Sequence, residues 1–141
     1  MSNQVELLLI EDNPADVRLV EIAIKNSGRN IHVHAMGDGE SALSYLRERN
    51  EYGMPKHPHL ILLDLNLPRK NGKEILKEIK NDENLRHIPV VILTSSQDKN
   101  DITQSYDLCA NCFVCKPSEW DQFMSTMDEL TKFWLDVAKI P

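Results

Sequence analysis

Five short apolar runs, separated by stretches of helical periodicity, restrict most strongly what this chain can fold into. Runs of this length between amphipathic stretches are typical of successive βα units around a parallel sheet. The sequence therefore predicts an α/β fold with five strands. The predicted strands cover Val5 to Ile10, Ile31 to Met36, Leu60 to Leu65, Val90 to Leu93 and Cys112 to Lys116.

A helix is predicted after each strand. The first begins near Pro14 and stops at Gly28, because proline suits a first helical turn and glycine a helix end. The strand at 31–36 alternates apolar and polar residues, as an edge strand does. A loop is predicted over Asn50 to His59, which is polar and carries three residues that break regular structure. The other helices are predicted over Glu40 to Arg49, Asn71 to Asn81, Lys99 to Leu108 and Glu119 to Leu135.

Length and charge narrow the function classes. At 141 residues the chain is expected to form one domain, with a core over about 5–135, a tail over 136–141 and no output domain. Its net charge of −6 has the wrong sign for nucleic-acid binding by phosphate neutralisation. It has no signal-like N-terminus and no apolar segment of the roughly 18 residues that cross a bilayer. Three closely spaced cysteines are a poor disulfide framework, so reduced thiols and a cytoplasmic location are expected.

Polar side chains follow four of the predicted strands. Glu11 and Asp12 come after the first, Asp64 ends the third, Thr94 ends the fourth and Lys116 ends the fifth. In open parallel sheets, ligands bind beyond the carboxyl ends of the strands. We therefore expect these side chains to form one site.

This donor set indicates phosphoryl transfer. Neighbouring carboxylates repel one another unless a cation compensates, and an all-oxygen set favours Mg²⁺. Glu11, Asp12, Asp64 and the backbone carbonyl of Asn66 are the expected ligands. Asp64 is the candidate nucleophile, while Lys116 and Thr94 would contact phosphoryl oxygens. The chain has no Gly-rich phosphate-binding loop of the ATPase type, so the phosphoryl group is expected from another donor.

These residues, in this order, resemble the receiver domain of two-component response regulators. The matching motifs are Glu11-Asp12, the apolar stretch around Asp64, Asn71-Gly72, Leu93 to Ser96 and Lys116-Pro117. The resemblance implies a doubly wound, flavodoxin-like sheet of order 2-1-3-4-5. It also implies transfer to Asp64 from a phosphohistidine on a sensor histidine kinase, and so a signalling phosphoacceptor rather than an enzyme. The segment from Asp64 to Gly72 further resembles the small regulators that partner phytochrome-type kinases.

The resemblance also implies roles for single residues. Thr94 and Phe113 would be switch residues, although Phe113 lacks the hydroxyl of the commoner tyrosine and a plain core role for it remains open. Asn66 and Ser96 would tune dephosphorylation. Glu11 replaces the commoner aspartate, which still permits metal binding. A cis peptide bond is implied between Lys116 and Pro117.

Output is expected through a protein surface. Receivers commonly use the face formed by the fourth helix, the fifth strand and the fifth helix. The last helix and the tail carry more apolar residues than a core of this size needs, so a homodimer through this face and the tail is predicted, with an unidentified downstream partner. These apolar residues are Trp120, Phe123, Trp134, Val137 and Ile140.

Four alternative interpretations stand beside this one. Met36 to Ala42 matches a dinucleotide-binding glycine motif, but it also suits a plain turn and helix start. Cys109, Cys112 and Cys115 resemble part of a ferredoxin run, but lack a fourth cysteine, so buried thiols are preferred. His57 and His59 suit a metal site by their spacing, but an exposed loop without metal is the preferred interpretation. A receiver-fold adaptor that works without phosphate is the functional alternative.

Overall fold

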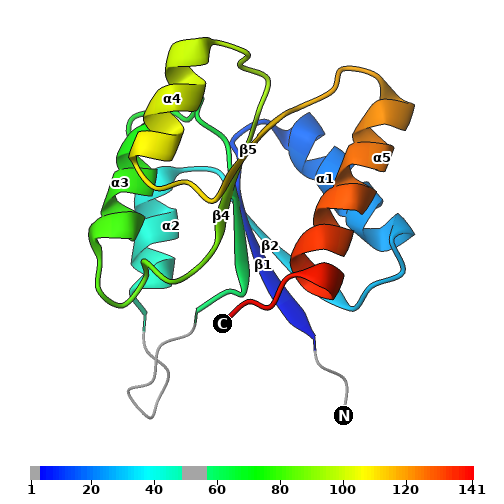
Figure 1. Ribbon diagram of the computed structural model, residues 1–141, viewed down its shortest axis with the longest axis horizontal. Helices are drawn as coiled ribbons and strands as arrows, with labels where there is room; N and C mark the ends of the chain where they lie inside the picture. The colour runs from blue at the N-terminus through cyan, green and yellow to red at the C-terminus, as the bar shows by residue number, and fades with distance from the viewer. Residues whose placement is uncertain (1–3, 49–56) are drawn as a thin grey trace.

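The chain alternates strand and helix, as predicted (Figure 1). A computed structural model describes residues 4–48 and 57–141. Its elements are β1 (Val5–Ile10), α1 (Pro14–Asn26), β2 (Ile31–Met36), α2 (Gly39–Leu46), β3 (Leu60–Leu63), α3 (Gly72–Asn81), β4 (Val90–Thr94), α4 (Lys99–Asp107), β5 (Cys112–Cys115), α5 (Trp120–Thr131) and the π-helix η1 (Lys132–Val137).

All five strands form one parallel sheet in the order β2-β1-β3-β4-β5. This order confirms the predicted α/β class and the topology that the receiver resemblance implied. It also confirms β2 as an edge strand. Because every strand runs in the same direction, the polar residues that follow the strands are delivered to a single edge of the sheet.

Helices cover both faces of the sheet (Figure 1): α2, α3 and α4 lie on one side, and α1 and α5 on the other. Successive strand residues point to opposite faces, so each central strand contributes to two apolar layers. In β1, Leu8 and Ile10 belong to the layer under α2 and α3, whereas Leu7 and Leu9 belong to the layer under α1 and α5. This two-sided burial explains why β3 and β4 read as almost uninterrupted apolar runs.

Local signals set the helix starts near the site. The Asn13 side chain accepts hydrogen bonds from the N–H groups of Ala15 and Asp16, which caps α1 directly after β1. The Asn71 side chain caps α3 in the same way. At the other end of α1, Gly28 has φ of +72°, a conformation that suits glycine after a helix. Both caps place a helix N-terminus at the carboxyl edge of the sheet.

Several predicted boundaries differ from those of the structure, most of them by one residue. Helix α2 begins at Gly39 and ends at Leu46. Strand β3 ends at Leu63, and just beyond it the carbonyl of Leu65 accepts the N–H of Gly72 instead of continuing the sheet. The last helix is α-helical only to Thr131 and then widens into η1. Most of the loop predicted over 50–59 lies outside the described residues. Within the described ranges, no helix is both long enough and apolar enough to span a bilayer.

Candidate functional site

The predicted site residues lie at the ends of neighbouring strands, and backbone hydrogen bonds hold them there. The N–H of Glu11 donates to the carbonyl of Met36, and the N–H of Asp64 donates to the carbonyl of Ile10. The N–H of Lys116 donates to the carbonyl of Thr94 at 2.7 Å. The ladder therefore continues just past the strands and fixes three charged residues at one edge.

Lys116 gathers three carboxylates. Its ammonium donates to Asp64 Oδ2 at 2.8 Å, to Asp16 Oδ2 at 2.9 Å and to Glu11 Oε1. The side chains of Lys116, Glu11 and Asp64 are only 8%, 3% and 7% exposed. A buried charge is tolerated when it is paired and hydrogen-bonded, and each of these charges meets that condition.

The remaining carboxylate oxygens are held by backbone. Asp64 Oδ1 accepts the N–H of Asn66 at 3.1 Å, and Glu11 Oε2 accepts the N–H of Asn13 at 3.1 Å. Asp64 is thus fixed at both oxygens, one by a cation and one by a neutral donor. This arrangement leaves a carboxylate in a defined orientation at the edge of the site.

Burial and charge separate the ionisation of the two acids. Burial, with the nearby Asp64, raises the pKa of Glu11 to about 7, although Lys116 opposes the change. Burial alone would also raise the pKa of Asp64, but its hydrogen bonds with Glu11, Lys116 and the N–H of Asn66 hold that pKa below its usual value. Burial alone would lower the pKa of Lys116, but its hydrogen bonds with the three carboxylates raise that pKa well above its usual range. Asp64 therefore stays ionised at neutral pH, as a nucleophile must.

The arrangement fits a hard divalent cation. One carboxylate oxygen from each of Glu11, Asp16 and Asp64 lies within 4.8 Å of the others, and no other group of three such ligands occurs in residues 4–48 and 57–141. Oxygen-only donors suit Mg²⁺ or Mn²⁺. Asp12, a predicted ligand, is exposed and is not part of this group. Asp16 was not predicted, and the available signal was an acid in the first turn of the helix that starts at the same edge.

Glycine at position 72 brings α3 against the phosphoacceptor candidate. A Cβ atom there would lie 2.3 Å from the carbonyl oxygen of Asp64 and 2.6 Å from the Cα of Leu65. Only a residue without a side chain permits this approach. The Asn71-Gly72 pair thus has two distinct tasks, capping α3 and seating it on the strand end that carries Asp64.

Thr94 and Ser96 sit beside the acidic group but in a separate network. Thr94 is fully buried, and its hydroxyl accepts the N–H of Ser96 at 3.4 Å. The Ser96 hydroxyl donates to Asp101 Oδ2 at 2.6 Å, and Lys73 of α3 reaches the other oxygen of Asp101 at 2.5 Å. These contacts tie the loop after β4 to both α3 and α4.

Phe113 is half-buried against the layer under α2 and α3. Its backbone N–H, on the open side of edge strand β5, donates to the hydroxyl of Tyr106 at 3.1 Å. Tyr106 belongs to α4 and is 49% exposed. One aromatic side chain of α4 therefore joins that helix to the edge strand where the other candidate switch residue lies.

One implied feature was wrong. The structure has no cis peptide bond within its described ranges, so Lys116 and Pro117 are joined by a trans bond. Trans is the favoured isomer by about 0.5–1 kcal/mol even before proline. The direction of the Lys116 side chain is set instead by its three carboxylate partners.

The alternative motifs have structural roles. Gly39 opens α2, where a Cβ would lie 2.2 Å from Ile75 Cδ1, so close helix packing accounts for the glycine motif. His59 Nδ1 accepts the N–H of Glu6 at 2.9 Å, which ties β3 to β1. All three cysteines are free, but the expectation of buried thiols is wrong for Cys109, which is exposed with φ of +73°, while Cys112 and Cys115 are half-buried. It ends the turn after α4, where the chain reverses into β5.

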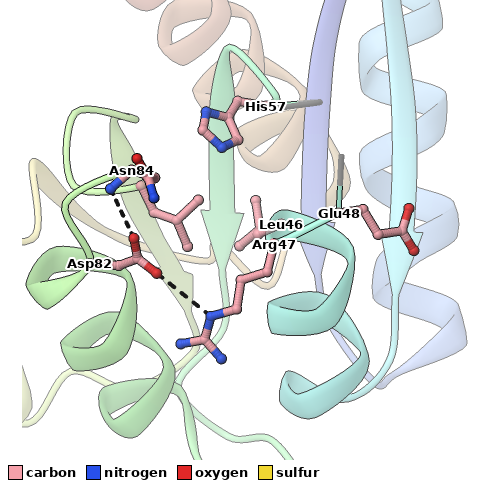
Figure 2. Close-up of a pocket in the computed structure, with 7 residues that line it drawn as sticks. Leu46, Arg47, Glu48, His57, Asp82 and Asn84 are labelled. Atoms are coloured by element: carbon pink, nitrogen blue, oxygen red, sulfur yellow. Dashed lines mark hydrogen bonds and ion pairs between the residues drawn. The ribbon is translucent and has the colours of Figure 1, made fainter. Parts of the chain in front are cut away.

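A separate pocket of about 120 Å³ lies near the C-terminal ends of α2 and α3, away from the acidic edge (Figure 2). Arg47 Nε lies 3.6 Å from Asp82 Oδ2, and the N–H of Asn84 donates to Asp82 Oδ1. Arg47 and Asp82 are thus paired with each other, and the lining residues include no group of carboxylates like that around Lys116. Of the two places, only the strand-end site has the group of carboxylates that fits a divalent cation.

Known proteins are similar to this chain in sequence and in fold. The model of the response regulator receiver domain matches residues 7–128. Response regulator Rcp1 of Synechocystis sp. (strain PCC 6803) is 39% identical over 135 residues, which span 96% of this chain and 92% of Rcp1. The structure of the phosphorylated cyanobacterial phytochrome response regulator RcpA aligns with a TM-score of 0.90 at 43% identity, over 98% of this chain and 99% of RcpA. The Mn²⁺-bound form of Rcp1 aligns with a TM-score of 0.88 at 39% identity, over 97% and 99%.

Geometry and comparison agree on one assignment. The acidic group around Lys116 is compatible with a divalent cation and with phosphoryl acceptance, and the fold has the receiver strand order. The matched range, residues 7–128, covers most of the chain and spans the positions of Glu11, Asp12 and Lys116. The chain belongs to the response regulator receiver domain family and is a signalling response regulator.

Proposed function

We propose that Asp64 accepts a phosphoryl group from a phosphohistidine of a sensor histidine kinase. The observation that carries this proposal is the contact of 2.8 Å between Lys116 Nζ and Asp64 Oδ2, in a site where Asp64 is buried yet kept ionised. A carboxylate oxygen attacks phosphorus, the P–N bond to the imidazole breaks, and a P–O bond forms. The bonding electrons leave with the imidazole nitrogen, and the product is an acyl phosphate.

The chain supplies charge compensation for this transfer. Lys116 is placed to contact an oxygen of the incoming group, since it already contacts the nucleophile. Following the receiver resemblance, Glu11, Asp12, Asp64 and the carbonyl of Asn66 are the proposed ligands of Mg²⁺, and Asp16, the third acid of the group around Lys116, is not among them. When bound, that ion would neutralise negative charge on the phosphoryl oxygens. The Mn²⁺-bound form of Rcp1 supports a divalent ion in this family.

The switch residues are assigned by position. We propose that Thr94 donates its hydroxyl to the phosphorylated Asp64, which would break its contact with the N–H of Ser96. Phe113 is the proposed aromatic partner on β5. Asn66, which is exposed beside Asp64, and Ser96 are proposed to set the lifetime of the acyl phosphate.

The proposed kinase is of the phytochrome type, and the cytoplasm is the proposed compartment. The description of RcpA as a cyanobacterial phytochrome response regulator supports this choice, at 43% identity. Three free thiols are in keeping with a reducing compartment. Purified phytochrome-type kinases loaded with labelled phosphate would provide the direct test, with transfer to Asp64 as the expected result.

We further propose a homodimer through α4, β5, α5 and the C-terminal tail. The large apolar side chains that are exposed come from α4, α5 and η1: Tyr106, Trp120, Phe133 and Val137. Sedimentation velocity with and without phosphorylation tests this proposal, with Phe133→Glu as the disrupting variant. A monomer at all concentrations and in both states would overturn it.

The central experiment is intact-mass analysis after incubation with Mg²⁺ and acetyl phosphate. We expect one phosphoryl adduct that requires Mg²⁺ and is lost in Asp64→Asn. Asp82→Asn is the matched control, because Asp82 is a carboxylate outside the strand-end site and its substitution should leave the adduct intact. If a known receiver is phosphorylated by the same donor and this protein is not, the phosphate-independent adaptor becomes the better hypothesis.

A further inference from the structure

Asp16 is the one carboxylate of the acidic group that the proposed phosphoryl transfer does not use. It comes from the first turn of α1 rather than from a strand end, and its Oδ2 accepts a hydrogen bond from Lys116 at 2.9 Å. Its side chain is 30% exposed, against 3% for Glu11 and 7% for Asp64. Asp16 therefore binds the lysine from the solvent side of the site.

The lysine has no unused donor in this state. An ammonium group has three N–H donors, and Lys116 directs them to Glu11, Asp16 and Asp64. Two of these three acceptors, Glu11 and Asp64, are also proposed ligands of the divalent cation. The same two carboxylates would thus serve two positive charges.

When a cation binds these two carboxylates, Asp16 is the acceptor that remains for Lys116. A divalent ion bound to Glu11 and Asp64 would weaken the hydrogen bonds that both carboxylates accept from Lys116, and it would repel the ammonium group. A lysine whose side chain is 8% exposed cannot lose its partners without a large desolvation cost. Of its three acceptors, only Asp16 lies outside the proposed ligand set. Asp16 is also held in place, because its N–H contacts the Asn13 side chain and the N–H of Asn13 contacts Glu11.

We propose that Asp16 is a positioning residue that keeps Lys116 in the site when a divalent cation occupies Glu11 and Asp64. This inference rests on the proposed function, because it assumes that the cation and the lysine act together. Its consequence is that the interaction between Asp16 and Lys116 is stronger in the cation-bound protein than in the cation-free protein. By linkage, Asp16 then strengthens cation binding through Lys116.

A double-mutant cycle read by calorimetry tests this coupling. Mg²⁺ and Mn²⁺ alone are titrated into the wild type, Asp16→Asn, Lys116→Met and the double variant. We expect Asp16→Asn to weaken cation binding in both backgrounds, because a negative charge is lost. The loss should be about threefold to tenfold larger when Lys116 is present, which is the size of coupling found for residues in one charge network.

Two further variants separate this role from helix stabilisation. Asp16→Glu keeps the carboxylate and should restore most of the affinity. Asp121→Asn removes an exposed first-turn acid from α5 and should leave the affinity unchanged. Lys116→Gln is measured beside Lys116→Met, so that the cycle can be closed with whichever variant retains the wild-type circular dichroism spectrum.

The outcomes are distinct from those of the phosphorylation experiment. An equal loss with and without Lys116 would make Asp16 a direct ligand or a distant charge, and would overturn the proposal while leaving phosphorylation of Asp64 intact. Tighter binding in Asp16→Asn would overturn it as well. Absence of any cation binding by the wild type would overturn both this inference and the proposed role of Mg²⁺.

Discussion

Replacing Gly72 by alanine should damage the structure at the phosphoacceptor, although alanine favours helices. The new Cβ would lie 2.3 Å from the carbonyl oxygen of Asp64, about 1 Å closer than the roughly 3.3 Å at which carbon and carbonyl oxygen normally meet. Both obstructing groups are backbone atoms, so α3 or the strand end must move. Overpacking of this kind costs about 1–3 kcal/mol.

The opposing term is the helix propensity of alanine, which gains at most about 1 kcal/mol over glycine. We therefore expect Gly72→Ala to lower the free energy of unfolding by roughly 2 kcal/mol, or the melting temperature by roughly 6–10 °C. Urea denaturation measures the free energy of unfolding and a thermal scan measures the melting temperature, each monitored by circular dichroism. Gly37→Ala is the matched control, since its Cβ would meet nothing closer than 3.8 Å. If Gly72→Ala proved as stable as the wild type or more so, the close approach of α3 to Asp64 would be refuted.

Three further predictions concern stability. The fold raises the pKa of Glu11 from 4.5 to about 7, so without metal the folded state holds this proton more tightly than the unfolded state does. The resulting stabilisation is complete below pH 4.5 and is lost as the pH rises through about 7. The free energy of unfolding should then fall by about 1–3 kcal/mol between pH 5 and pH 8, and denaturation of Glu11→Gln should lack this slope. Arg29→Ala removes contacts of its guanidinium with Asp128 and Asp136; faster amide exchange confined to 132–137 is expected, and unchanged exchange there would contradict the contact. Cys109→Gly should raise the free energy of unfolding by about 0.5–1 kcal/mol, because φ of +73° strains any side chain, and a urea midpoint below that of the wild type would contradict the strain.

The sheet and its site edge were predictable from the sequence. Strands buried on both faces, such as β3, leave uninterrupted apolar runs, and a polar residue directly after such a run must lie at the carboxyl edge. Glu11, Asp64 and Lys116 follow that rule, and the structure places them in direct contact. The strand order came from the family resemblance, because hydrophobic periodicity carries no information on which strands are neighbours.

Other features of the structure could not be predicted from the hydrophobic periodicity of the sequence. Asp16 is a helix residue, and its contact with Lys116 depends on where the Asn13 cap starts α1, which no strand-end rule covers. The widening of the last helix at Lys132 leaves no local signal, because its residues are ordinary helix residues. The trans bond before Pro117 shows that a feature carried over from the family need not hold in this chain.

The layer under α1 and α5 joins the two ends of the chain. Leu7 and Leu9 of β1 and Val20 of α1 pack in the same cluster as Phe123 and Leu130 of α5. During synthesis the first βα unit therefore leaves the ribosome with an apolar face that only the last helix can cover. Folding must wait until nearly the whole chain has emerged, and a nascent chain stalled before residue 120 would be a substrate for chaperones and proteases.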